Sequence, residues 1–134
     1  MSEPPTDSRP SERYWYNKFA NALHGTRLGI RGQHSFRVHF ATAAAAVVCG
    51  AALGVSRHEW YMLLLCITVV LAAEMFNSAL ESMARAITHE HNPHLGGALD
   101  IGSAAVLVAS VGAALIGLLI FTRQLLVLLG WWGG

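Results

Sequence analysis

The stretch AAEMFNSALES, residues 72–82, places three polar side chains inside the long apolar segment of residues 60–87. Glu74, Asn77 and Glu81 are spaced by three and then four residues, which puts them on one face of a helix. A carboxylate at membrane depth costs several kcal/mol, so it is retained where it faces a protein interior or water. The stretch therefore predicts a functional site on a membrane helix. The structural alternative is a polar seam that joins helices through hydrogen bonds of about 1 kcal/mol or less.

The composition is that of an integral membrane protein. Of the 134 residues, 54% are hydrophobic and 13% are charged, whereas a soluble domain carries roughly 25% charged residues. The length suits one domain and is too short for two. The net charge of +1 gives no strongly basic surface, so we expect no nucleic-acid partner.

Three apolar segments are each long enough for a transmembrane helix, which takes about 20 residues. They lie at about residues 36–55, 60–87 and 98–123. Residues 56–59 predict a tight turn between the first two segments. Residues 88–97, which contain a proline and a glycine pair, predict a loop before the third. The expected fold class is therefore an all-α integral membrane protein.

The two ends of the chain differ from the spans. Residues 1–11 are polar and proline-rich, which is typical of a disordered tail. Residues 12–33 carry apolar side chains at helical spacing among basic ones, and predict an amphipathic helix on the membrane surface. Residues 124–134 end near two tryptophans and predict an interfacial tail. We expect residues 12–134 to form a single membrane domain.

Basic residues gather before the first span. They are Arg9, Arg13, Lys18, Arg27, Arg31 and Arg37. Cytoplasmic segments of membrane proteins carry an excess of lysine and arginine, so we expect the N-terminus and the loop at residues 88–97 to be cytoplasmic. The polar face of the second span then opens toward cytoplasmic solutes.

Further polar residues lie in this loop and at the start of the third span. Asp100 and Ser103 are either ligands or residues favoured by the positive end of a helix dipole. The loop carries His89, Glu90, His91 and His94. Short histidine clusters can bind zinc, but a solvated loop is the better interpretation of a segment with proline and glycine. The sequence contains no glycine-rich phosphate-binding motif, which excludes a soluble-type nucleotide fold.

Two motifs resemble those of the small prokaryotic membrane diacylglycerol kinase and undecaprenol kinase family. The second span carries Glu74-x-x-Asn77-Ser-Ala-Leu-Glu81, and Asp100-Ile-Gly-Ser103-Ala-Ala-Val-Leu opens the third. The resemblance covers nearly the whole chain, from about residue 14 to residue 120. It implies a homotrimer of three-span subunits in the bacterial inner membrane. Such a protein transfers the γ-phosphate of MgATP to the hydroxyl of diacylglycerol or undecaprenol, near the cytoplasmic face.

The resemblance also implies roles for individual residues. Glu74 would be the general base on the lipid hydroxyl, Asn77 would orient substrate or phosphate, and Glu81 would bind magnesium. The nucleotide would contact Glu81, Glu90, His91, Asn92 and Asp100. The lipid would contact Phe36, Arg37, Ser78 and Ser103.

Four positions depart from the family pattern. Tyr14 stands where the family has an arginine, with Arg13 one residue away. Gln33 stands where the family has a second metal-binding glutamate, and can offer magnesium a neutral carbonyl oxygen. Leu99 replaces a lysine that neutralises phosphate charge. Arg85 replaces an aspartate, and we hypothesise that it supplies the missing positive charge from one turn beyond Glu81.

These departures leave two alternatives to an active kinase. The first is a relative with a weakened nucleotide site, which binds lipid, serves as an assembly partner or runs the reaction toward dephosphorylation. The second is a small proton or metal pathway built on the two glutamates.

Overall fold

The computed structural model describes residues 12–32, 34–88, 90 and 92–131. These residues form four helices, α1 (Glu12–Gly32), α2 (His34–Leu53), α3 (Arg57–Ile87) and α4 (Pro93–Leu128). The described part of the chain contains no strand, so the expected all-α fold class is confirmed. The tail predicted to be disordered, residues 1–11, lies outside the described residues.

Helix α1 belongs to a compact unit of its own, residues 1–32, while residues 33–134 form a second unit. Its aromatic residues Trp15 and Phe19 are exposed, and the ammonium group of Lys18 lies 4.9 Å from the ring centroid of Tyr14. Exposed aromatic rings beside basic side chains suit a helix that lies in a membrane interface. The surface location of α1 stays a prediction.

The other three helices are long and apolar enough to cross a membrane. Large apolar side chains are exposed along all of them. On α4 they include Leu107, Val108, Leu115, Leu118 and Leu119. Such an extensive apolar surface is not tolerated in water and marks contact with lipid or with another protein surface. The three segments predicted as spans are therefore confirmed as helices of membrane-crossing length.

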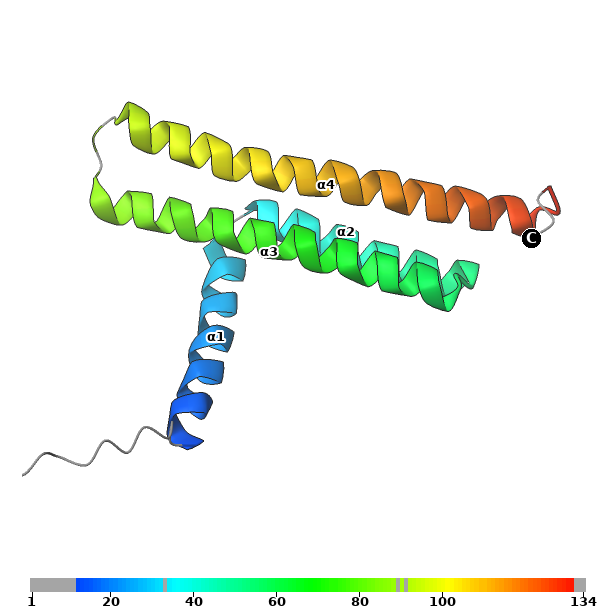
Figure 1. The fold of residues 1–134 in the computed structure, drawn as a ribbon, viewed down its shortest axis with the longest axis horizontal. Coiled ribbons are helices and arrows are strands. Elements are labelled where there is room, and N and C mark those ends of the chain that lie inside the picture. Colours follow the sequence, from blue (N-terminus) through cyan, green and yellow to red (C-terminus); the bar gives the residue numbers. More distant parts are fainter. Residues whose placement is uncertain (1–11, 33, 89, 91, 132–134) are drawn as a thin grey trace, which may run out of the picture. The chain divides into compact units, whose positions relative to one another are not determined.

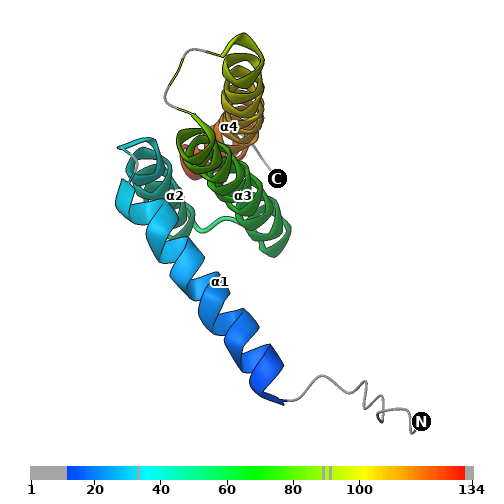
Figure 2. The ribbon, with the colours of Figure 1, turned by 90° about the vertical axis from the view of Figure 1, so that its left-hand side faces the viewer.

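Helix α3 is flanked by α2 and by α4 in the unit of residues 33–134 (Figures 1 and 2). It packs most extensively against α4. A core cluster of Val55, Leu63 and Ile120 lies at the end of α3 opposite the connection to α4. Gly50 on α2 lets the ring of Trp60 come close, since a Cβ there would lie 3.1 Å from a ring carbon. This apolar cluster and the polar face of α3 that begins at Glu74 therefore lie in different parts of the bundle.

The start of α3 is fixed by a capping box. The side chain of Ser56 accepts a hydrogen bond from the backbone N–H of Glu59, at 3.4 Å, and the Glu59 carboxylate accepts one from the backbone N–H of Ser56, at 2.7 Å. This reciprocal arrangement satisfies two backbone donors that a helix start leaves free. The predicted turn is thus shorter than residues 56–59, because α3 already begins at Arg57.

Helix α4 begins earlier than the sequence predicted. The side chain of Asn92 accepts hydrogen bonds from the next two available backbone N–H groups, at 3.0 and 3.2 Å. Pro93 occupies the first helical turn, where a missing N–H has no partner to lose. The loop predicted over residues 88–97 is therefore wrong beyond Asn92, because the proline starts the helix, and the expected span start at residue 98 lies inside α4.

Helix α4 also continues beyond the predicted span, as far as Leu128. The side-chain amide of Gln124 donates to the backbone carbonyls of Leu53 and Gly54, at 3.1 Å each. One residue earlier, Arg123 forms a 3.0 Å salt bridge with Glu59. The first residues of the segment predicted as an interfacial tail are therefore a packed part of α4.

Candidate functional site

Glu74 is the most deeply buried large side chain among the described residues, with 1% of its surface exposed. Two residues of α2 face its carboxylate. The hydroxyl of Ser35 donates a hydrogen bond to Oε1, and Nε2 of His39 lies 3.8 Å from Oε2. A buried carboxylate costs little free energy only when such polar partners replace water. The carboxylate is therefore built into the contact between α2 and α3.

One turn further along α3, Asn77 and Glu81 form a connected pair. The Asn77 amide donates to Oε1 of Glu81 at 3.0 Å. The other carboxylate oxygen of Glu81 lies 3.7 Å from the guanidinium of Arg85. Asn77 is buried, whereas the side chain of Glu81 is 33% exposed and that of Arg85 is 65% exposed. The polar face of α3 thus passes from a buried carboxylate to a solvent-accessible cation.

The carbonyl oxygen of Asn77 has no hydrogen-bond partner among the described residues, although it is buried. It points at α4, because a Cβ placed on Gly102 would lie 2.6 Å from it. The same Cβ would lie 3.0 Å from a methyl carbon of Leu80. Only glycine therefore leaves room for the present position of the Asn77 side chain at this crossing of α3 and α4.

A pocket of about 430 Å³ opens at the end of α3 and the start of α4. Its lining includes four of the residues predicted to contact nucleotide, Glu81, Arg85, Glu90 and Asn92. Leu99 also lines this pocket. The structure therefore brings Arg85 into the same pocket as the leucine that it was hypothesised to compensate.

Other predicted site residues do not line this pocket. Asp100 and Ser103 are exposed on α4 and do not line it. Arg37 is exposed on α2. Phe36 and Ser78 are buried, with 3% and 8% of their surfaces exposed. Their predicted contacts with nucleotide or lipid stay predictions.

Two predicted site residues lie outside the described residues. They are Gln33, expected to bind magnesium, and His91, expected to contact the nucleotide. His89, from the loop considered for zinc, is outside them as well. Across the part of the chain that the structure describes, no three histidine, cysteine or acidic side chains gather as a metal site.

The chemistry of the pocket nevertheless fits magnesium that arrives with a nucleotide. Magnesium usually keeps several waters and is held by one or two carboxylates together with substrate phosphates. Glu81 offers a carboxylate that is 33% exposed at the wall of the pocket, and Glu90 lines the same pocket. A dedicated cage of protein ligands is not needed for this mode of binding.

Sequence reasoning missed the two side chains that face Glu74. Ser35 and His39 are four residues apart, so they lie on one face of α2, Ser35 just before the first apolar segment and His39 inside it. That is the same signal that singled out Glu74 and Glu81 on the second span. The sequence analysis assigned roles to the neighbouring Gln33, Phe36 and Arg37, but none to Ser35 or His39.

The whole chain is similar in sequence to known proteins. Residues 20–121 match the family described as "Prokaryotic diacylglycerol kinase". The undecaprenol kinase of Bacillus subtilis is 33% identical over 119 residues, which cover 89% of this chain and 97% of that protein. The diacylglycerol kinase of Escherichia coli K12 is 32% identical over 91 residues, or 68% of this chain and 75% of that protein. The diacylglycerol kinase of Pseudomonas aeruginosa is 28% identical over 109 residues, or 81% of this chain and 89% of that protein.

Proposed function

The chain belongs to the prokaryotic diacylglycerol kinase family and is a bacterial membrane lipid kinase, and we propose that it transfers the γ-phosphate of ATP to a membrane lipid hydroxyl at the cytoplasmic face. The observation that carries the proposal is the continuous polar face of α3. It leads from Glu74, buried at 1% exposure, to Arg85 in an open pocket. A buried base suits a phosphoryl acceptor that lies in the membrane. A solvent-accessible pocket that binds anions suits a phosphoryl donor that comes from water.

The donor end of the site is the pocket at the junction of α3 and α4. A guanidinium presents five N–H donors in a planar arrangement that matches phosphate oxygens. Arg85 brings this group into a pocket that also holds the carboxylates of Glu81 and Glu90. Its contact with Glu81 is long, at 3.7 Å, and exposed, so the side chain can turn toward a bound triphosphate at little cost. Asp100 and His91 stay proposed nucleotide contacts from the resemblance.

The acceptor end of the site is Glu74. Phosphoryl transfer depends mainly on positioning the two oxygens in line and on stabilising phosphate charge. A general base must in addition lie within reach of the alcohol proton. Glu74 has one carboxylate oxygen fixed by Ser35, while the other is held less tightly, with His39 at 3.8 Å. We assign to it the removal of the proton from the lipid hydroxyl, with Asn77 orienting the reacting groups.

Magnesium is expected to enter with the nucleotide. Glu81 would hold it, together with Gln33. The ion would neutralise charge on the phosphates. The hydrogen bond from Asn77 orients the Glu81 carboxylate for that task.

The lipid acceptor is proposed to be diacylglycerol or undecaprenol, which are the substrates named for the relatives. Phe36, Arg37, Ser78 and Ser103 are proposed lipid contacts. The exposed apolar sides of the three long helices suit the proposed homotrimer as well as contact with lipid. An inner-membrane location with a cytoplasmic N-terminus completes the proposal.

A direct experiment offers both acceptors to purified protein in detergent micelles. Radiolabelled MgATP is supplied with short-chain diacylglycerol or with undecaprenol, and phospholipid product is measured. We expect turnover with one acceptor or both, and its loss in Glu74→Gln. Glu59→Gln is a matched control, because it neutralises a carboxylate at the opposite end of the same helix. Turnover that survives in Glu74→Gln contradicts the assignment of the base.

The same experiment tests the alternative of a weakened relative, which Leu99 in the nucleotide pocket favours. In that case neither acceptor is phosphorylated and MgATP does not bind. Binding of MgATP that depends on Arg85 would instead support the kinase.

A further inference from the structure

We propose that His39 works with Glu74 as a proton-handling pair, in which the imidazole positions the carboxylate and then receives the proton taken from the lipid alcohol. The inference rests on the proposed function, since it assumes that Glu74 is the base. His39 belongs to α2 and Glu74 to α3, and Nε2 of the ring lies 3.8 Å from Oε2 of the carboxylate. The pair is thus formed across the contact of two helices.

The burial of Glu74 creates the need for such a partner. Its side chain is 1% exposed, so a proton that it accepts cannot pass directly to water. It must nevertheless lose one proton in every turnover. His39 is 22% exposed and contacts the carboxylate at the same time. Ser35 also contacts the carboxylate and is exposed, but of these two partners only the imidazole of His39 is a customary proton shuttle.

The two carboxylate oxygens have different neighbours, which assigns them different tasks. Oε1 accepts the hydroxyl hydrogen of Ser35, so that oxygen is already engaged. Oε2 faces His39 and is the oxygen available to accept the alcohol proton. Contacts of this kind are often long in the absence of substrate and shorten when the reacting complex forms. The 3.8 Å separation allows that adjustment.

Proton removal accompanies the transfer of the phosphoryl group. The O–H bond of the lipid alcohol breaks, and its proton passes to Oε2 of Glu74. The alcohol oxygen forms a bond to the γ-phosphorus, while the bond from that phosphorus to the bridging oxygen breaks and leaves ADP. Glu74 then gives the proton to Nε2 of a neutral His39 whose ring hydrogen is on Nδ1, because only the ring nitrogen without a hydrogen can accept it. Release of a proton from the ring to water restores both groups.

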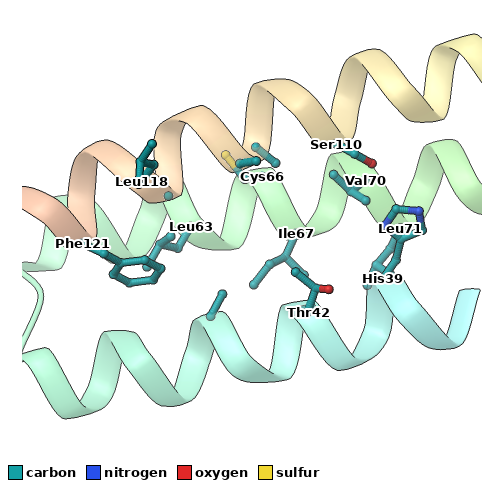
Figure 3. A pocket seen from close by; sticks show the side chains of 15 residues that line it. His39, Thr42, Leu63, Cys66, Ile67, Val70, Leu71, Ser110, Leu118 and Phe121 are labelled. Atoms are coloured by element: carbon teal, nitrogen blue, oxygen red, sulfur yellow. The ribbon is translucent and has the colours of Figure 1, made fainter.

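The surroundings of His39 leave Glu74 as its principal charged neighbour. His39 lines an apolar pocket of about 360 Å³ between α2, α3 and α4. Figure 3 shows its ring at one end of this pocket, beside Leu71, with Phe121 at the other end. Among the described lining residues, α3 adds one more ionisable group, the thiol of Cys66, and α4 adds none. A change of charge on the imidazole is therefore felt mainly by the carboxylate.

The test compares kcat and KM in wild type, His39→Gln and His39→Ala, the last with and without added imidazole. We expect His39→Gln to lower kcat by about 10²-fold, as for other lost proton-transfer groups, with the KM for MgATP unchanged. Added imidazole should partly restore turnover in His39→Ala, which a packing role alone would not produce. His58→Gln, at the far end of α3 and exposed, should behave as wild type.

Each outcome decides the question. A wild-type kcat in His39→Gln overturns the proposal, while loss of turnover in Glu74→Gln still supports the proposed function. A slow His39→Gln together with a His39→Ala that imidazole does not restore assigns His39 a packing role only and overturns the proton transfer. If the wild type phosphorylates no lipid, the proposed function fails and this inference fails with it.

Discussion

At the residue scale, Gly102 determines whether Asn77 can occupy its place. A Cβ at this position would lie 2.6 Å from the Asn77 carbonyl oxygen, so Gly102→Ala must displace the side chain or separate α3 from α4. We expect a loss of about 1–3 kcal/mol in unfolding free energy, as for other overpacked sites, and a fall in kcat. Thermal denaturation in detergent and a kinase assay measure both. Gly112→Ala is the matched control, because its new Cβ meets nothing within 4 Å.

Arg85 allows a second prediction at the residue scale. Its i,i+4 contact with Glu81 is exposed and contributes only about 0.3–0.5 kcal/mol to stability. A hydrogen bond to a charged phosphate contributes about 1.5–3 kcal/mol. We therefore expect Arg85→Ala to raise the KM for MgATP roughly tenfold or more without a comparable change in unfolding temperature, and Arg85→Lys to be intermediate.

The control for this change is Arg57→Ala, which removes an exposed arginine at the other end of α3. Its KM for MgATP should equal that of the wild type. An Arg85→Ala variant with an unchanged KM would show that the pocket obtains its positive charge elsewhere.

Sequence reasoning identified part of this site for a clear physical reason. Glu74, Asn77 and Glu81 share one helix, so their spacing alone indicates that they share a face. The partners of Glu74 come from another helix, and Ser35 is 39 residues away in sequence. Which faces of two helices meet depends on their rotation and packing, which no local pattern records. The orientation of the Asn77 carbonyl toward Gly102 likewise depends on how α3 and α4 pack, so no local pattern predicts it.

At the element scale, the end of α4 is hydrogen-bonded to the connection between α2 and α3. Gln124 donates to the backbone carbonyls of Leu53, the last residue of α2, and Gly54. Each such bond contributes about 0.5–1.5 kcal/mol. We expect Gln124→Leu to lower the unfolding free energy by about 1–3 kcal/mol. Its kcat should be close to wild type, because the polar residues of α3 lie toward the other end of the helix.

Denaturation followed by circular dichroism in detergent measures this effect. Thr122→Val, at an exposed position of the same turn, should leave stability unchanged. Equal stability of Gln124→Leu and wild type would mean that the two bonds contribute nothing to the packing of α4.

The helices themselves were largely predictable, but both ends of α4 were not. Long apolar runs identified all three membrane-length helices, and α3 ends at Ile87 as expected. The start of α4 was missed because Pro93, Gly96 and Gly97 were interpreted as helix breakers. In the structure Asn92 caps the helix and Pro93 fits its first turn. The glycines are tolerated there, as they commonly are in membrane helices.

At the scale of the whole molecule, the predicted topology places the connection between α3 and α4 in the cytoplasm. Two single-cysteine variants, Thr88→Cys and Arg57→Cys, report on the two sides of the membrane. Cys49 and Cys66 are first replaced by alanine. A membrane-impermeant maleimide should label position 57 in intact cells and position 88 only after permeabilisation. The reverse labelling pattern would contradict a cytoplasmic kinase site, because the pocket that holds Arg85 lies beside Thr88.

In the proposed function, Glu74 is retained at membrane depth for proton removal, and nucleotide is held separately by the pocket at the end of α3. The most direct test measures MgATP binding by calorimetry and phospholipid formation on the same preparation of Glu74→Gln. We predict binding of MgATP with wild-type affinity and no detectable phospholipid. Phospholipid formation at the wild-type rate would contradict the account, because the buried carboxylate would then be no more than a link between helices.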